Sequence, residues 1–112
     1  MKITKYFLGF LFAFALTFAF SNQTQAQTNK RKVKKRQVNQ KKRIRNGVKS
    51  GELTKKETRK LRRQQKNIRK TKREAKADGK VTRKERRKIN RKQNRASKNI
   101  YRKKHNKRKR KQ

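Results

Sequence analysis

The sequence of 112 residues contains no cysteine and no proline. The lack of cysteine excludes disulfide bonds, thiolate metal sites and the attachment of a lipid to a cysteine. The lack of proline means that no residue forbids a long helix through its ring and its missing amide hydrogen. The length allows one domain at most, and the two absences together permit a small helical protein without a covalent staple.

Acidic residues are scarce as well. The chain has five of them against 43 lysines and arginines, and its formal net charge is +38. All five lie in or beside two stretches, residues 49–57 (KSGELTKKE) and residues 77–85 (ADGKVTRKE). Because they gather in two places, we infer that these carboxylates serve local structure rather than charge balance.

Aromatic residues are confined almost entirely to the beginning of the chain. All six phenylalanines lie in the apolar run Tyr6–Phe20, which follows Lys2 and Lys5 and precedes a polar segment that ends at Ala26. These are the three regions of a secretory signal. The run is shorter than the roughly 20 residues that span a bilayer, which disfavours the alternative of a retained membrane anchor. Residues 1–26 are therefore predicted to be a signal peptide, cleaved near Ala26, and the protein is predicted to be periplasmic or secreted.

Removal of this leader changes the composition of the chain. Residues 27–112 keep 41 basic and five acidic residues, and Tyr101 is their single aromatic residue. Large aliphatic residues are few, so composition alone allows disorder. An internal repeat argues against pure disorder, because residues 50–70 align without gaps with residues 78–98. A random basic tail would not keep glycine, threonine and glutamate in register over such a span.

Each repeat carries a signal for the start of a helix. A threonine precedes a glutamate by three residues in both, Thr54 before Glu57 and Thr82 before Glu85. In such a capping box the threonine hydroxyl accepts a backbone N–H of the first turn, and the carboxylate accepts the N–H of the threonine. The carboxylate also complements the positive end of the helix dipole. A glycine before each aliphatic residue of the turn allows the positive φ that ends the preceding segment.

The sequence therefore predicts an all-α fold of two or three helices in a loose hairpin or bundle, with helices at about 30–46, 55–77 and 83–104. Within them, apolar residues recur at helical spacing with glutamines between them. The predicted seams are Val33, Gln37, Gln40 and Ile44; Leu61, Gln65, Ile68 and Ala75; and Ile89, Gln93, Ala96 and Ile100. Leu53 and Val81 occupy matching positions in the two turns, and we expect this pair to bridge them.

The predicted organisation of the chain has four parts. They are residues 1–26 as the signal peptide, 27–46 as a basic helical arm, 47–106 as a two-repeat helical region, and 107–112 as a disordered basic tail. The first helix is expected to end at Asn46-Gly47, and the chain is expected to fray from residue 102 onward.

The turns between the predicted helices resemble the second half of an EF-hand calcium loop. On that template, Gly51 and Gly79 take the sixth position, while Glu57 and Glu85 take the twelfth. The third position is a valine in the first turn and a lysine in the second, so neither turn has enough oxygen ligands. The surrounding cations also repel a divalent ion. We therefore predict degenerate EF-hand-like turns that hold no metal.

The sequence suggests no catalytic constellation. Its single histidine, His105, lies in the basic tail, and Ser50 and Ser97 have no histidine and acid arranged around them in the sequence. A phosphate-binding glycine loop, an HExxH motif and a CxxC motif are all absent. We predict a protein that is not an enzyme, with no catalytic residues, no cofactor and no small-molecule substrate.

The excess of positive charge is the main functional signal. Basic residues make up nearly half of residues 27–112, which solubility does not require. Such a surface attracts polyanions through the release of their counterions. No DNA-reading motif is present, and one aromatic residue cannot form a stacking platform for single strands, so binding without sequence preference is predicted. The diffuse site is predicted to comprise Arg59, Arg62, Arg63, Arg69, Lys70, Arg86, Arg87, Arg91, Arg95, Arg102, Lys103 and Lys104.

Export limits the partners to polyanions outside the cytoplasm, namely extracellular DNA, anionic lipopolysaccharide or acidic envelope polysaccharide. Two alternatives are a structural envelope protein that binds a protein partner through its helix seams, and a membrane-active cationic peptide whose partner is a membrane surface. The second alternative needs a broad apolar face, which residues 27–112 lack.

The ending QNRASKNIYRKKHN (93–106), together with SGELTKKE and ADGKVTRKE, resembles a group of small exported bacterial proteins of uncharacterised function. Proteins of this group look like repeats of G-x-L-T-x-x-E followed by a helix, with the ending Q-N-x-x-S-x-x-I-Y-x-x-K-H-N. The likeness covers about residues 43–106 and brings no known activity, and the extreme basicity of this chain departs from it. The resemblance implies a shared surface made of Gln93, Asn94, Ser97, Ile100, Tyr101, Lys104, His105 and Asn106.

Overall fold

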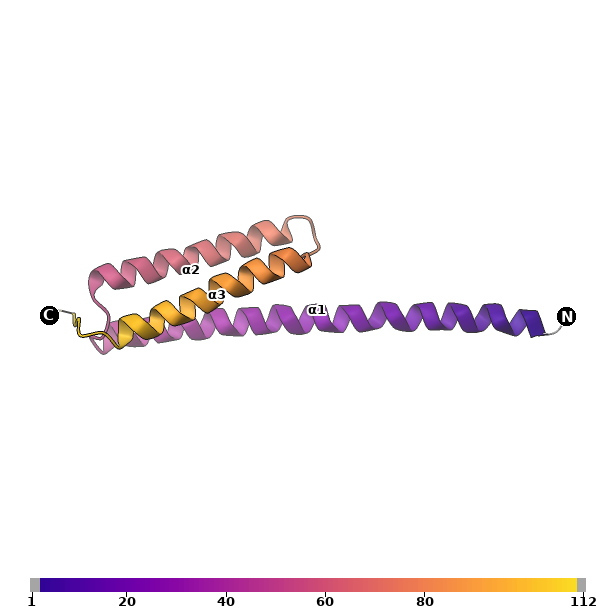
Figure 1. Ribbon diagram of the computed structural model, residues 1–112, viewed down its shortest axis with the longest axis horizontal. Helices are drawn as coiled ribbons and strands as arrows, with labels where there is room; N and C mark the ends of the chain where they lie inside the picture. Colours follow the sequence, from indigo (N-terminus) through magenta and orange to yellow (C-terminus); the bar gives the residue numbers. More distant parts are fainter. Residues whose placement is uncertain (1–2, 111–112) are drawn as a thin grey trace. The chain divides into compact units, whose positions relative to one another are not determined.

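The computed structural model describes the backbone of residues 3–110 and the side chains of residues 26–110. It contains three helices, α1 (Ile3–Lys49), α2 (Lys55–Lys76) and α3 (Arg83–Lys104), and no strand among residues 3–110 (Figure 1). The predicted all-α class is therefore confirmed. The bounds of α2 and α3 agree with the predicted ones to within a residue, because both helices begin at the capping boxes found in the sequence.

The first helix differs from its prediction at both ends. It begins at Ile3 rather than near residue 30, and it continues to Lys49 through Gly47, where the sequence had suggested an end. A Cβ atom on Gly47 would lie 2.8 Å from Cδ1 of Leu53, so this glycine makes room for a core side chain instead of ending the helix. The positive φ of the first turn is found at Gly51 (+74°). The side chains of residues 1–25 lie outside the described part of the chain, and the signal peptide stays a prediction.

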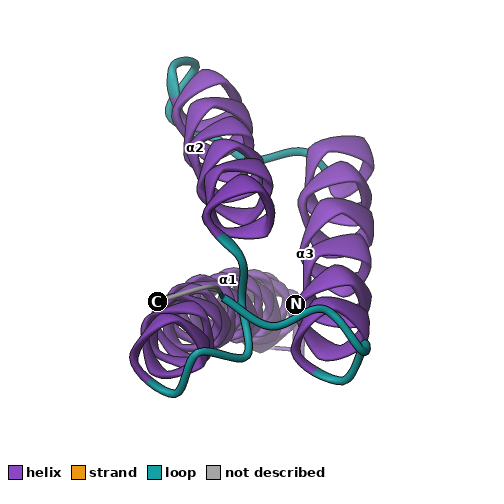
Figure 2. Cartoon of the chain, turned by 90° about the vertical axis from the view of Figure 1, so that its left-hand side faces the viewer, coloured by secondary structure: helices purple, strands orange, loops and turns teal. Residues whose placement is uncertain are grey.

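The chain divides into two compact units, residues 1–34 and residues 35–112. The second unit contains the last turns of α1 together with α2 and α3 (Figure 2). Their buried side chains form a narrow core. All the hydrogen bonds between helices described below lie within residues 35–110. A chain that starts at residue 27 therefore keeps the whole of this bundle.

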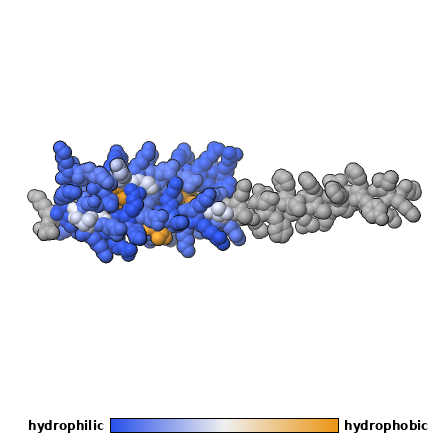
Figure 3. Space-filling view, turned by 90° about the horizontal axis from the view of Figure 1, so that it is seen from below, coloured by the Kyte–Doolittle hydropathy of each residue, from blue (hydrophilic) through white to orange (hydrophobic). Residues whose placement is uncertain are grey.

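The core of the second unit is small. Ile44, Leu53, Leu61 and Ile100 form one buried cluster, and Val48 packs against it. The predicted seams are confirmed on α2, where Leu61, Gln65, Ile68 and Ala75 are buried, and on α3, where Ile89, Gln93, Ala96 and Ile100 are buried. On α1, Gln37, Gln40 and Ile44 are buried as predicted, whereas Val33 is only half-buried and belongs to the first unit. In Figure 3 hydrophilic residues cover most of the visible surface of this unit.

The expected bridge between Leu53 and Val81 is wrong. Leu53 is fully buried in the core cluster, whereas Val81 is only half-buried and lies outside it. The reason is the 22-residue helix α2, which runs between the two turns. At 1.5 Å per residue it is about 33 Å long, so the turns lie at opposite ends of one helix rather than side by side as in a pair of EF-hands.

The segment after α3 runs back to the first turn. α3 ends at Lys104, as predicted, and residues 102–104, which were also expected to fray, belong to the helix. After it, the backbone N–H of Arg110 donates to the carbonyl of Gly51 (2.9 Å), and Nε of Arg110 donates to the carbonyl of Leu53 (3.1 Å). Residues 111–112 lie outside the described part of the chain. Arg110 thus contacts the turn between α1 and α2.

Candidate polyanion-binding surface

The predicted polyanion-binding residues lie on the outer faces of α2 and α3. The exposed members are Arg59, Arg62, Arg63, Arg69, Lys70, Arg86, Arg87, Arg91, Arg95 and Arg102, and the half-buried ones are Lys103 and Lys104. Periodicity explains this arrangement, because the narrow apolar seam of each helix leaves the remaining positions facing water. The result is a surface on which like charges follow one another at helical spacing.

Carboxylates neutralise little of this charge. Nζ of Lys104 lies 3.3 Å from Glu52, and Nζ of Lys70 lies 3.9 Å from Glu74. The second pair is largely exposed, and exposed pairs of this kind contribute about 0–1 kcal/mol. With five acidic residues in the whole chain, most cations have no carboxylate to pair with.

The cations that join the helices donate to neutral groups instead. Nζ of Lys92 on α3 donates to Asn67 Oδ1 (2.8 Å) and Thr71 Oγ1 (2.7 Å) on α2. Nζ of Lys72 donates to Gln37 Oε1 (2.9 Å), and Nη1 of Arg36 donates to Asn94 Oδ1 (2.8 Å). These hydrogen bonds hold the bundle together without cancelling its positive charge, which therefore remains effective toward a ligand.

Both capping boxes are present. The Thr54 N–H donates to Glu57 Oε2 (3.1 Å), and the Glu57 N–H donates to the Thr54 hydroxyl (3.2 Å). In the second box the corresponding distances between Thr82 and Glu85 are 2.8 and 3.2 Å. Each box satisfies backbone donors that the first turn of a helix would otherwise leave without partners.

The first capping box is also tied to the end of the chain. Glu57 is only 4% exposed, and its Oε1 accepts a hydrogen bond of 2.6 Å from the side-chain amide of Asn106. Burial raises the pKa of this carboxyl, but hydrogen bonds from the Thr54 backbone, Asn106 and the Thr54 hydroxyl outweigh it, so that the pKa lies below its ordinary value. A hydrogen bond from Ser50 and another from Lys104 likewise lower the pKa of Glu52.

A buried layer of glutamines joins the three helices. Nε2 of Gln40 on α1 donates to the Gln93 carbonyl and to the Ser97 hydroxyl of α3, both at 2.8 Å. Its Oε1 accepts a hydrogen bond of 3.0 Å from Nε2 of Gln65 on α2. The sequence showed that glutamines interrupt each seam, but their mutual bonding could not be inferred without the packing. Oε1 of Gln65 and Nε2 of Gln37 are buried without a protein partner.

The ending that carries the resemblance does not form one surface. Gln93 and Ile100 are fully buried, Ser97 accepts from Gln40, and Asn94 accepts from Arg36 on the outside. Tyr101 and His105 are exposed and stack on each other, with ring centroids 4.2 Å apart. Most of the motif therefore has a structural role, joining α3 and the segment after it to α1 and to the first turn.

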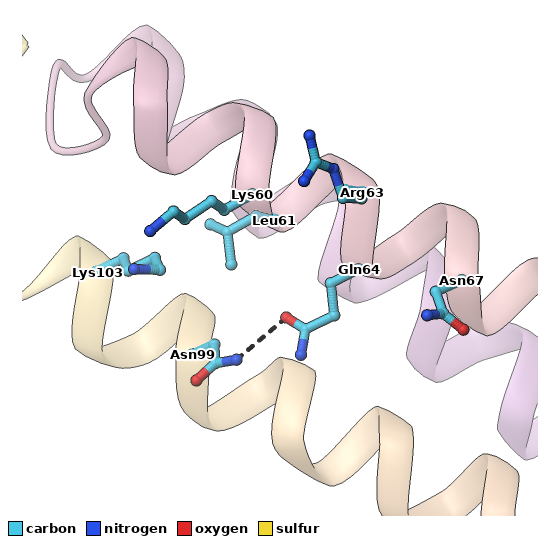
Figure 4. Close-up of a pocket in the computed structure, with 7 residues that line it drawn as sticks. All are labelled: Lys60, Leu61, Arg63, Gln64, Asn67, Asn99 and Lys103. Atoms are coloured by element: carbon cyan, nitrogen blue, oxygen red, sulfur yellow. Dashed lines mark hydrogen bonds between the residues drawn. The ribbon is translucent and has the colours of Figure 1, made fainter.

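A groove between α2 and α3 was not foreseen from the sequence. Its volume is about 430 Å³, and three of its lining residues are cations, three are amides and one is apolar. These residues are Lys60, Leu61, Arg63, Gln64, Asn67, Asn99 and Lys103. In Figure 4 the hydrogen bond from Asn99 Nδ2 to Gln64 Oε1, 3.3 Å long, crosses the groove.

The described residues offer no metal centre. Among them, no group of three or more histidine, aspartate or glutamate side chains is placed to hold an ion. The turns keep one EF-hand feature, the positive φ of Gly51 (+74°) and Gly79 (+78°). The carboxylate of Glu57, at the start of α2, accepts hydrogen bonds from Thr54 and Asn106.

Within the part of the chain that the structure describes, no helix combines the length and the apolar character needed to cross a membrane. Comparisons of the chain with protein-family models, with curated proteins and with solved structures found no match. The resemblance to small exported bacterial proteins therefore stays a prediction, and function has to be argued from the surface itself.

Proposed function

We propose that the chain is an exported, non-enzymatic protein that binds polyanions without sequence preference. Its ligands are extracellular DNA or an anionic polysaccharide of the cell envelope. One observation carries the proposal: most cations of α2 and α3 lie on exposed faces, and those that bond across the helix interfaces use neutral amides and hydroxyls as acceptors. The bundle therefore keeps most of its positive charge on the surface, where a ligand can reach it.

Counterion release makes such a surface a binding site. Each phosphate that a cation neutralises frees part of the condensed counterion layer of duplex DNA, which lowers the logarithm of the binding constant by about 0.9 for each tenfold rise in salt. The arginines and lysines on α2 and α3 are distributed around both helices and are not arranged as a single recognition face. Contacts of this kind fix a polymer on the surface but do not read its sequence.

The two alternative functions are less well supported. Binding of a protein partner through the helix seams would require those seams to be open, yet Leu61 and Ile100 are 1% and 0% exposed. A membrane-active peptide needs a broad apolar face. The large exposed apolar side chains of the described part are Val38 and Tyr101, which do not make such a face.

The test is a titration of the chain from residue 27 with duplex DNA and with an acidic polysaccharide at increasing salt. A steep loss of affinity with salt for at least one of the two polymers supports the proposal. An affinity that hardly changes with salt would favour a protein partner instead, and leakage of dye from anionic vesicles would favour the membrane-active class.

A further inference from the structure

The groove between α2 and α3 has the chemistry of a site for one small acidic unit. Lys60 of α2 and Lys103 of α3 lie near one end of it, close to Leu61, and Asn67 lies at the other end (Figure 4). None of its lining residues is acidic. Its volume of about 430 Å³ falls in the range of roughly 300–1,000 Å³ that small-ligand sites occupy.

The amides that line the groove present their nitrogens to a ligand. Gln64 Oε1 accepts from Asn99, Asn67 Oδ1 accepts from Lys92 at 2.8 Å, and Asn99 Oδ1 accepts from Arg102 at 2.7 Å. Each amide oxygen therefore has a donor already. Each amide nitrogen still carries hydrogens for further bonds. Together with two ammonium groups, they favour a ligand that is negatively charged and rich in acceptor oxygens.

Duplex DNA and an acidic polysaccharide differ in the size and flexibility of the unit that each could place in the groove. A duplex is a stiff rod whose phosphates are spread over a convex surface, and it can meet exposed cations anywhere on the bundle. A sugar acid carries a carboxylate, hydroxyls and a ring oxygen on one compact unit, and its polymer can direct that unit into a groove. The lining has two lysines at one end, and Arg63 and the amide donors along the rest (Figure 4). This arrangement fits a carboxylate beside hydroxyl and ring oxygens.

We propose that this groove binds one uronic acid residue of an acidic polysaccharide, with Lys60 and Lys103 at the carboxylate and the nitrogens of Gln64 and Asn67 at the hydroxyl and ring oxygens. This inference rests on the proposed polyanion binding and names the polymer class that the groove selects. Duplex DNA, in contrast, meets the cations of both helices as separate charges, Arg63 and Lys103 among them, and does not depend on the shape of the groove.

The experiment compares two double variants that remove equal charge from the same two helices. K60Q/K103Q removes the groove lysines, whereas K66Q/K98Q removes one lysine from each helix that does not line the groove. Binding of polygalacturonate and of duplex DNA is measured for the chain from residue 27 at one fixed salt concentration. The groove variant is expected to lose at least tenfold more affinity for polygalacturonate than the control variant, and both are expected to lose equal affinity for DNA.

Two variants that leave the net charge unchanged distinguish the contribution of the groove's hydrogen bonds from that of charge. N67A, which removes a groove amide, is expected to weaken polygalacturonate binding about threefold and to leave DNA binding unchanged. N90A, which changes an exposed amide outside the groove on α3, is expected to change neither. Circular dichroism checks that all variants keep the helicity of the parent chain.

The outcomes distinguish the inference from the function on which it rests. If K60Q/K103Q and K66Q/K98Q lose polygalacturonate affinity equally, or if the parent chain binds DNA but not polygalacturonate, the groove assignment is overturned and polyanion binding stands. If the parent chain binds neither polymer, both proposals fail.

Discussion

The side-chain amide of Asn106 donates a hydrogen bond of 2.6 Å to the buried carboxylate of Glu57, which lies 49 residues earlier in the sequence. The same carboxylate caps α2 through Thr54. One acidic residue thus begins a helix and also holds the segment that follows α3. Its counterpart Glu85 caps α3 in the same way but remains half-buried, so the two repeats differ in how far each cap is integrated into the bundle.

This difference predicts unequal effects for one substitution at the two caps. E57Q places an amide nitrogen where the Thr54 N–H, the Thr54 hydroxyl or Asn106 now donates, so we expect a loss of about 1–3 kcal/mol in the free energy of unfolding. E85Q keeps a capping-box residue, since glutamine also serves there, and loses about 0.3–1 kcal/mol of dipole interaction. Urea unfolding of both variants measures the difference. Equal losses would show that Asn106 does not bond to Glu57 in solution.

The lowered pKa values predict that acid destabilises the bundle. The folded chain holds the protons of Glu52 and Glu57 less tightly than the unfolded chain does, because hydrogen bonds favour both carboxylates. Protonation therefore favours unfolding. The stabilisation is complete above the ordinary glutamate pKa of about 4.3 and is lost as the pH falls through the folded-state pKa. Urea unfolding should give a lower free energy at pH 3 than at pH 7, and E57Q should reduce this difference. A variant with the parent's full pH dependence would contradict the role of Glu57.

The glutamine layer predicts a non-additive pair of substitutions. Q40L removes the acceptor of Gln65 Nε2 and leaves that buried donor without a partner, which should cost about 1–3 kcal/mol. In Q40L/Q65L both partners are apolar, and replacing both can be nearly neutral. We expect the double variant to unfold at a higher urea concentration than Q40L alone. A further loss in the double variant would indicate that the two side chains do not bond to each other.

The close contact between Gly47 and Leu53 predicts that G47A destabilises the protein, although alanine favours a helix more than glycine does. Alanine is favoured over glycine by about 1 kcal/mol in a helix interior. Its Cβ, however, would lie 2.8 and 2.9 Å from two carbon atoms of the buried Leu53, and overpacking costs about 1–3 kcal/mol. Thermal unfolding should show a lower midpoint for G47A. N39A, at an exposed position of α1, should leave the midpoint unchanged or raise it. A higher midpoint of thermal unfolding for G47A would mean that the core near Leu53 can accommodate the added methyl group.

Local signals explain why α2 and α3 could be predicted from the sequence. Their capping boxes lie within four residues, Thr54 to Glu57 and Thr82 to Glu85, and the apolar seams repeat along each helix. Such features act between residues that are close in sequence, so they can be read without knowing the packing. The same holds for the positive φ of Gly51 and Gly79, which precede an aliphatic turn residue by two positions.

The features that escaped prediction depend on residues that are distant in sequence. Gly47 is helical and lies against Leu53, a contact that depends on how the turn folds back onto α1 and that the sequence does not reveal. The bond between Asn106 and Glu57, the glutamine layer and the groove between α2 and α3 all require the helices to be placed together. The resemblance implied a shared surface at the end of α3, yet Gln93 is buried and bonded within the bundle.

The central claim is that the positive charge of the bundle binds polyanions without reading sequence. The most direct measurement is the affinity of the chain from residue 27 for two duplexes of unrelated sequence between roughly 50 and 400 mM salt. Counterion release changes the affinity strongly over salt concentrations of this order. We predict equal affinities for the two duplexes and a slope of about −5 or steeper in a plot of log K against log salt, which corresponds to about six neutralised phosphates. A slope near zero, or a strong preference for one duplex, would contradict the claim.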